Sequence, residues 1–122
     1  MAKILIVDDS AVIRDLLTEF LGELGHLVDS ATDGAEGLDM ARSGDYDLCI
    51  CDVHLPKING YQLLIQLGAA RGQTQFIFTD SLPDELADKI RETTGFVCLR
   101  KPFDLHQVRE VLDRAIEKIR SR

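Results

Sequence analysis

Short apolar runs alternate with segments of helical hydrophobic spacing along the whole chain. The first run, residues 3–8, reads KILIVD and predicts a buried strand. Residues 10–24 have apolar side chains every three or four positions, as in an amphipathic helix, and Gly25 is placed to end it. The same alternation predicts further strands over 26–31, 46–51, 75–79 and 96–99, and helices over 35–42, 61–70, 83–93 and after Asp104.

This order of elements favours an α/β fold. Five strands that alternate with five helices are typical of a parallel sheet with helices on both faces, the doubly wound arrangement. A chain of 122 residues predicts one domain over 1–122. Right-handed crossovers place every strand-to-helix loop at the carboxyl edge of the sheet, and ligands bind outside that edge. Candidate functional residues are therefore expected there.

Composition narrows the class of protein. Apolar residues make up 45% of the chain, which predicts a folded globular domain. The net charge is −7, and 12 acidic residues against 4 basic ones lie in residues 1–61, which argues against sequence-independent nucleic-acid binding. The first apolar run is too short for a signal peptide or a membrane span. Cys49, Cys51 and Cys98 each lie in an apolar run, which predicts buried, reduced thiols in a cytoplasmic protein.

Polar residues follow four of the predicted strands at their carboxyl ends: Asp8, Asp9, Asp52, Thr79, Asp80 and Lys101. Each alone has an ordinary explanation, such as helix capping or a solvated loop. Together, carboxylates at one edge repel each other unless a cation neutralises them, and Mg²⁺ prefers such ligands. With a lysine and a hydroxyl beside them, they predict phosphoryl transfer with a carboxylate as nucleophile.

Four motifs carry a resemblance to a known family. They are VDDS at 7–10, CDVHLP at 51–56 with Gly60, Thr79, and KPF at 101–103. In this order, the chain resembles the receiver domains of response regulators, of the CheY-like type. The resemblance implies a flavodoxin-like sheet with strand order 2-1-3-4-5 and a cis Lys101–Pro102 bond. It also implies a switch that catalyses only its own phosphorylation and slow dephosphorylation.

The resemblance also implies a role for each site residue. Asp52 would accept a phosphoryl group from a sensor histidine kinase or a histidine phosphotransfer protein. Asp9, Asp52 and the backbone carbonyl of His54 would bind Mg²⁺, with Asp8 acting through a water. Lys101 would pair with a phosphoryl oxygen, and Thr79 would move to hydrogen-bond the attached group. The output would pass to a downstream protein target or output domain, without direct contact to nucleic acid or membrane.

Two positions, Asp80 and Cys98, depart from the family pattern, and a third, His54, is one where family members vary. Asp80 stands where a small residue is usual. It either faces the site, where repulsion and crowding would slow phosphorylation or alter the lifetime of the phosphoryl group, or it turns to solvent. Cys98 stands where an aromatic switch residue is common, and Phe96 lies two residues away on the same strand face. His54 either influences hydrolysis of the phosphoryl group or is an exposed loop residue. His26 and His106 show no metal-ligand clustering and are interpreted as ordinary.

Two alternative functions remain. Asp80 and Cys98 favour a receiver-fold interaction module that signals without phosphorylation, and the intact set of acidic residues, threonine and lysine opposes it. A phosphatase of the haloacid dehalogenase type usually has an aspartate where His54 stands, which makes that class improbable. The segment after Leu112 is too short for a DNA-binding module. We therefore expect a stand-alone regulator, a phosphorelay intermediate, or the receiver of a longer chain.

Overall fold

The computed structural model describes residues 1–81 and 85–121, and it has the predicted alternation of strands and helices. All strand pairs in the sheet are parallel, and the strand order is β2-β1-β3-β4-β5. The α/β doubly wound prediction with order 2-1-3-4-5 is therefore confirmed. The elements are β1 Lys3–Val7, α1 Ala11–Glu23, β2 Leu27–Ala31, α2 Gly34–Ser43, β3 Leu48–Asp52, α3 Gly60–Leu67, the 3-10 helix η1 Gly68–Arg71, β4 Gln75–Asp80, α4 Glu85–Thr94, β5 Val97–Arg100 and α5 Leu105–Arg120.

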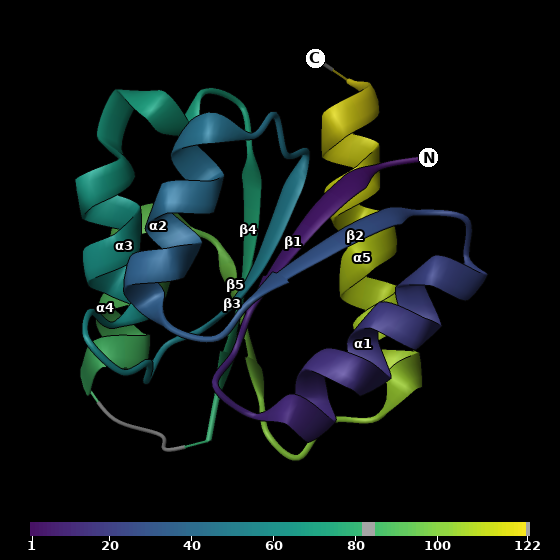
Figure 1. Cartoon of the computed structure of the whole chain (residues 1–122), viewed down its shortest axis with the longest axis horizontal. Coiled ribbons are helices and arrows are strands. Elements are labelled where there is room, and N and C mark those ends of the chain that lie inside the picture. Colours follow the sequence, from purple (N-terminus) through teal and green to yellow (C-terminus); the bar gives the residue numbers. More distant parts are fainter. Residues whose placement is uncertain (82–84, 122) are drawn as a thin grey trace.

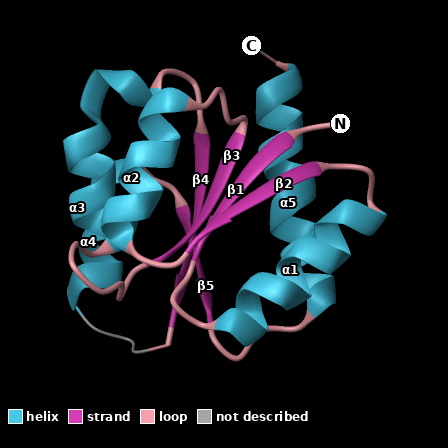
Figure 2. Cartoon of the chain, viewed as in Figure 1, coloured by secondary structure: helices cyan, strands magenta, loops and turns pink. Residues whose placement is uncertain are grey.

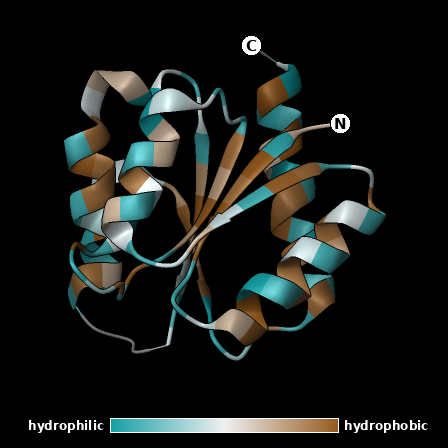
Figure 3. Cartoon of the chain, viewed as in Figure 1, coloured by the Kyte–Doolittle hydropathy of each residue, from teal (hydrophilic) through white to brown (hydrophobic). Residues whose placement is uncertain are grey.

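The sheet divides the core into two layers. Figure 1 shows α2, α3 and α4 on one side of the sheet and α1 and α5 on the other, and Figure 2 shows the strands between them. In Figure 3 the strands at the centre are largely hydrophobic, as expected for a parallel sheet buried on both faces. Alternate residues of β4 enter different layers: Phe76 and Phe78 pack with α2–α4, and Ile77 packs with α1 and α5. The direction of each functional side chain follows from this alternation.

Polar residues begin the helices where the sequence places them. Ser10 caps α1, because its side chain accepts a hydrogen bond from the N–H of Ile13 at 3.3 Å. Asp104 caps α5 as predicted: its side chain accepts from the Gln107 N–H, and the Gln107 side chain accepts from the Asp104 N–H, which forms a capping box. These caps satisfy N–H groups that a helix leaves without partners. They therefore define where the loops at the carboxyl edge end.

Two predictions needed correction. The helix predicted over 61–70 ends at Leu67, because Gly68 has a φ of 52°, which ends the α-helical path and leads into η1. Cys98 is half-buried rather than buried, because it lies on the edge strand β5; Cys49 and Cys51 are buried as predicted. The predicted helix start at Pro83 lies outside the described residues.

Within residues 1–81 and 85–121, no helix combines the length and the apolar character that a bilayer crossing requires.

Candidate functional site at the carboxyl edge of the sheet

Three acidic residues meet at the carboxyl ends of β1 and β3. Val7 and Cys51 are register partners on these strands, so the residues that follow them, Asp8 and Asp52, lie beside each other. One carboxylate oxygen from each of Asp8, Asp9 and Asp52 lies within 4.8 Å of the other two. Asp8 and Asp52 are 2% and 4% exposed, whereas Asp9 is exposed. The tertiary structure thus brings together the acidic residues that the sequence predicted for one site.

Lys101 places a positive charge against this cluster. Its Nζ donates to Asp8 Oδ2 at 2.8 Å and to Asp52 Oδ2 at 3.0 Å. Burial lowers the pKa of Lys101, but the hydrogen bonds to the two carboxylates outweigh burial and leave that pKa above its usual value. Lys101 therefore stays charged at neutral pH. The Lys101–Pro102 peptide bond is cis, as the resemblance implied.

Burial dominates the electrostatics of Asp52. Loss of solvent raises the pKa of this carboxyl, and the hydrogen bond and charge of Lys101 only partly counteract it. The His54 N–H also lowers it, by donating to Asp52 Oδ1 at 3.1 Å. The negative charge of Asp52 thus costs free energy, and the hydrogen-bond donors of Lys101 and His54 partly stabilise it. Such a carboxylate gains stability from any further cation near it.

Gly60 lets the acceptor loop, residues 53–59, pack against Asp52. A Cβ at this glycine would lie 2.6 Å from the backbone oxygen of Asp52, closer than atoms approach. The Gly60 N–H donates to the Val53 carbonyl at 2.8 Å, which closes the loop. Gly60 is therefore required by space rather than by its φ angle. It was part of the sequence motif, but only the structure supplies this reason.

Thr79 lies beside Asp52 in the register of β3 and β4. It is 2% exposed, and its Oγ1 makes no hydrogen bond within residues 1–81 and 85–121. A buried hydroxyl without a partner costs free energy, of about 1–3 kcal/mol. The hydroxyl is thus available to an oxygen atom that enters the site from outside.

Asp80 does not turn to solvent. It is 5% exposed, and its Oδ1 lies 3.3 Å from His54 Nε2. The solvent-facing alternative for Asp80 is therefore wrong, and the exposed-loop interpretation of His54 is incomplete, because this histidine contacts a buried carboxylate. Sequence reasoning missed the pair. The one available signal was that both residues follow neighbouring strands at the same edge of the sheet.

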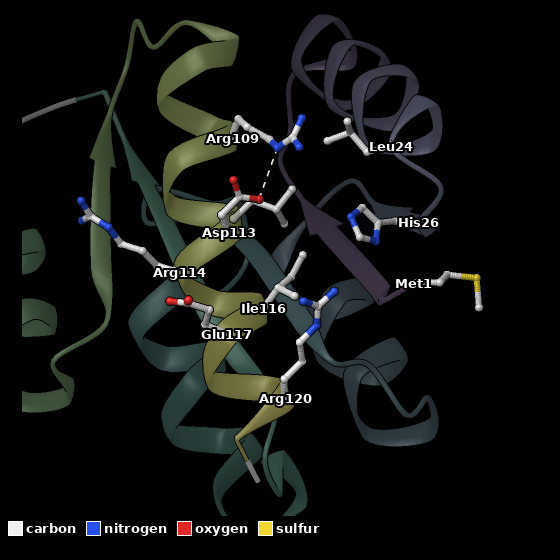
Figure 4. Close-up of a pocket in the computed structure, with 10 residues that line it drawn as sticks. Met1, Leu24, His26, Arg109, Asp113, Arg114, Ile116, Glu117 and Arg120 are labelled. Carbon is white, nitrogen blue, oxygen red and sulfur yellow. Dashed lines mark hydrogen bonds and ion pairs between the residues drawn. The ribbon is translucent and has the colours of Figure 1, made fainter.

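A hollow of about 500 Å³ lies away from this site, where the amino ends of β1 and β2 face α5. Figure 4 shows Arg109, His26 and Arg120 around it, with Arg109 paired to Asp113 at 3.3 Å. His26 Nδ1 accepts a hydrogen bond from the Ala2 N–H at 3.0 Å, a structural role that agrees with its ordinary interpretation. The walls carry charges of both signs. Its chemistry differs from that of the carboxyl-edge site.

A doubly wound sheet with an acidic cluster, a lysine and a buried threonine at its carboxyl edge defines a class of phosphoryl-accepting switch domains. The family model for the response regulator receiver domain matches residues 4–113. The chain therefore belongs to the response regulator receiver family.

Individual relatives agree with this assignment. The transcriptional regulatory protein HprR of Escherichia coli is 33% identical over 108 residues, covering 87% of this chain and 48% of HprR. The sensor histidine kinase RcsC of E. coli is 31% identical over 120 residues, covering 96% of this chain and 12% of RcsC. The crystal structure of response regulator protein TrrA from Thermotoga maritima, in complex with Mg²⁺–BeF, has a TM-score of 0.83 and 30% identity, covering 94% of this chain and 99% of TrrA. The chain spans less than half of the length of HprR and of RcsC.

Proposed function

We propose that Asp52 accepts a phosphoryl group from a phosphohistidine and that the resulting charge switches the affinity of this domain for a protein partner. The observation that carries the proposal is the environment of Asp52. This buried carboxylate is hydrogen-bonded to Lys101 and lies beside the hydroxyl of Thr79, which has no hydrogen-bond partner among the described residues. The proposed domain covers residues 1–122, and we propose that it acts in the cytoplasm.

The donor set at this site fits Mg²⁺. Carboxylate oxygens from Asp8, Asp9 and Asp52 meet within 4.8 Å, and oxygen is the ligand atom that Mg²⁺ prefers. Asp9 and Asp52 would hold the ion directly with the carbonyl of His54, and Asp8 would act through a water. When bound, the ion supplies positive charge against phosphoryl oxygens. The exposure of Asp9 supports this assignment, because it leaves a side of the cluster open to solvent.

A carboxylate oxygen of Asp52 attacks phosphorus, the new P–O bond forms, and the P–N bond of the phosphohistidine breaks with its electron pair left on the histidine nitrogen. Water later attacks phosphorus, and the P–O bond breaks. Phosphate leaves, and the Asp52 carboxylate is restored. The domain is thus a phosphoacceptor and acts catalytically only on itself.

Two side chains would act on the attached group. Lys101 already lies against Asp52 and would exchange this contact for a phosphoryl oxygen, stabilising charge in the transition state. Thr79 would donate a hydrogen bond from its hydroxyl, which has no partner in the described part of the chain, to another phosphoryl oxygen. Because that hydrogen bond exists only after phosphorylation, it favours a second conformation of the end of β4 and shifts the equilibrium between two states.

The partners follow from this chemistry. The donor would be a sensor histidine kinase or a histidine phosphotransfer protein, and the recipient of the signal a protein target or an attached output domain. The relatives support this, since they include a regulator and a sensor kinase. The acidic net charge argues against direct nucleic-acid binding.

Intact mass spectrometry tests the proposal. The protein is incubated with Mg²⁺ and acetyl phosphate, and we expect a mass increase of one phosphoryl group that survives acid and is lost in base. Asp52→Asn should show no increase, whereas Asp39→Asn, on the exposed surface of α2, should match the wild type. Absence of the adduct in the wild type would overturn the proposal and favour the non-phosphorylated interaction module.

A further inference from the structure

The contact between His54 and Asp80 joins the phosphoacceptor site to the opposite layer of the molecule. Thr79 follows Phe78 on β4, so its side chain falls on the α1–α5 side of the sheet, where Asp8 and Asp52 also lie by the same alternation. Asp80 is the next residue and therefore points to the other side. His54 reaches across the edge of the sheet from the acceptor loop to meet it.

Asp80 is embedded among residues of α4 and β5. It lines a small hollow, of about 40 Å³, together with Ala87, Arg91, Cys98 and Arg100. Burial raises the pKa of the Cys98 thiol, and the nearby negative charge of Asp80 raises it further. The Asp80 carbonyl also accepts a hydrogen bond from the Lys101 N–H at 2.7 Å. Asp80 therefore contacts both Lys101, through its backbone carbonyl, and the surface formed by α4 and β5.

His54 is tied equally closely to Asp52. Its N–H donates to Asp52 Oδ1 at 3.1 Å, while its Nε2 contacts Asp80 at 3.3 Å. One residue thus touches the acceptor carboxylate with its backbone and the buried carboxylate with its side chain. A change at Asp52 that moves the backbone of His54 must also alter the contact with Asp80.

We propose that Asp80 is a positioning residue which acts through His54, and that this pair transmits the phosphorylation state of Asp52 to the surface formed by α4 and β5. The inference rests on the proposed function of Asp52. The contact holds the acceptor loop and the end of β4 together in the unphosphorylated domain. The phosphoryl group adds about one negative charge and three acceptor oxygens beside the His54 backbone, so it weakens this contact and releases Asp80.

The pair gives a route that is separate from Thr79. Thr79 acts in the α1–α5 layer, whereas Asp80 acts in the layer that contains α4 and the inner side of β5. Cys98 occupies the β5 position where the family resemblance places an aromatic switch residue. The His54–Asp80 pair would therefore carry a signal to α4 and β5 without a moving aromatic ring at that position.

Cys98 itself supplies the readout. It is half-buried beside Asp80, whereas Cys49 and Cys51 are 1% and 0% exposed, so a thiol reagent should label Cys98 selectively. The labelling rate of the full chain is measured with Mg²⁺, with and without acetyl phosphate. Intact mass gives the phosphorylated fraction of each sample. A Cys98→Ser variant identifies the background.

We expect phosphorylation to raise the labelling rate of wild-type Cys98 about fivefold, because a coupling of this kind is typically at least that large. In Asp80→Ala the rate should be high from the start and independent of the phosphorylated fraction. His54→Ala should behave alike, and the double variant should be no faster than either single one, since both remove one contact. His54→Gln, which keeps an N–H donor, should recover part of the response. Asp39→Asn should respond as the wild type does.

The outcomes separate the two proposals. An adduct on the wild type with no change in Cys98 labelling, or with the same change in Asp80→Ala, overturns the coupling and leaves the phosphoacceptor function intact. Equal basal labelling in the wild type and Asp80→Ala also overturns it. Absence of any adduct overturns both. Circular dichroism on each variant establishes that faster labelling does not come from unfolding.

Discussion

Removal of Lys101 provides a quantitative test of the electrostatics at the site. Lys101→Met keeps an unbranched side chain of similar length but deletes the charge that contacts Asp8 at 2.8 Å and Asp52 at 3.0 Å. The Lys101 side chain is 17% exposed, and the side chains of Asp8 and Asp52, taken without their backbone atoms, are 3% and 5% exposed, so solvent screens these pairs only weakly.

The expected loss is substantial. Removing one partner of a buried ion pair leaves the remaining charges without compensation, which costs about 3–5 kcal/mol. Residual solvent at Lys101 and protonation of a carboxylate relieve part of this cost. We therefore expect Lys101→Met to lower the free energy of unfolding by about 2–4 kcal/mol in a metal-free buffer. Added Mg²⁺ should restore part of the loss, because it neutralises the same carboxylates.

The pH dependence has a definite sign. The pKa of Lys101 is raised above its usual value of 10.5 in the folded protein, so its charge stabilises the fold fully below pH 10.5. That contribution declines as the pH rises above 10.5, because the unfolded lysine loses its proton there first, and it is lost once the pH has passed the higher pKa of folded Lys101. The difference between wild type and Lys101→Met should therefore be constant near neutral pH and shrink in strong alkali.

Urea denaturation with EDTA, and with Mg²⁺, measures these effects. Lys57→Met is the matched control, because the Lys57 side chain is 66% exposed and its ion pair with Asp33 should contribute less than about 1 kcal/mol. A loss in Lys101→Met no larger than in Lys57→Met would refute the reasoning, as would a loss that Mg²⁺ does not reduce.

Three further predictions concern neighbouring positions. Burial raises the pKa of Asp52 above 3.8, so its charge opposes folding at neutral pH. In EDTA, thermal or urea unfolding should show that Asp52→Asn raises the free energy of unfolding by about 1–2 kcal/mol. This gain should shrink as the pH falls through the folded pKa toward 3.8. Gly60→Ala should lower the free energy of unfolding by about 1–3 kcal/mol and form the phosphoryl adduct more slowly, because its Cβ would meet the Asp52 backbone oxygen. Gly22→Ala in α1, with open space around the Cβ, is the control and should raise the free energy of unfolding by about 0.5–1 kcal/mol. Thr79→Val should leave the free energy of unfolding of the unphosphorylated protein equal or up to about 1 kcal/mol higher, because the buried Thr79 hydroxyl has no partner within the described residues. The variant should also abolish the stability change that phosphorylation causes in the wild type.

The local pattern of apolar and polar residues predicts some elements of the fold better than others. The strands of the sheet centre were predictable, because β1 and β3 are continuous apolar runs buried on both faces. The end of α3 was not, since the helical spacing continued past Gly68 and only the backbone turn at that glycine ended the helix. The half-burial of Cys98 was also unpredictable, because an apolar run does not reveal that its strand lies at the sheet edge.

The sequence by itself determined which chemical groups reach the carboxyl edge. In a parallel sheet every strand ends at the same edge, so the order of strands and helices already gathers Asp8, Asp52, Thr79 and Lys101 there. The tertiary structure decided which of them touch. Register places Asp8 beside Asp52, and Lys101, which follows β5, contacts both carboxylates. Packing on the other face buries Asp80 against His54. Contacts between residues distant in the chain depend on strand order, register and side-chain direction together, and a local pattern of residues specifies none of these distances.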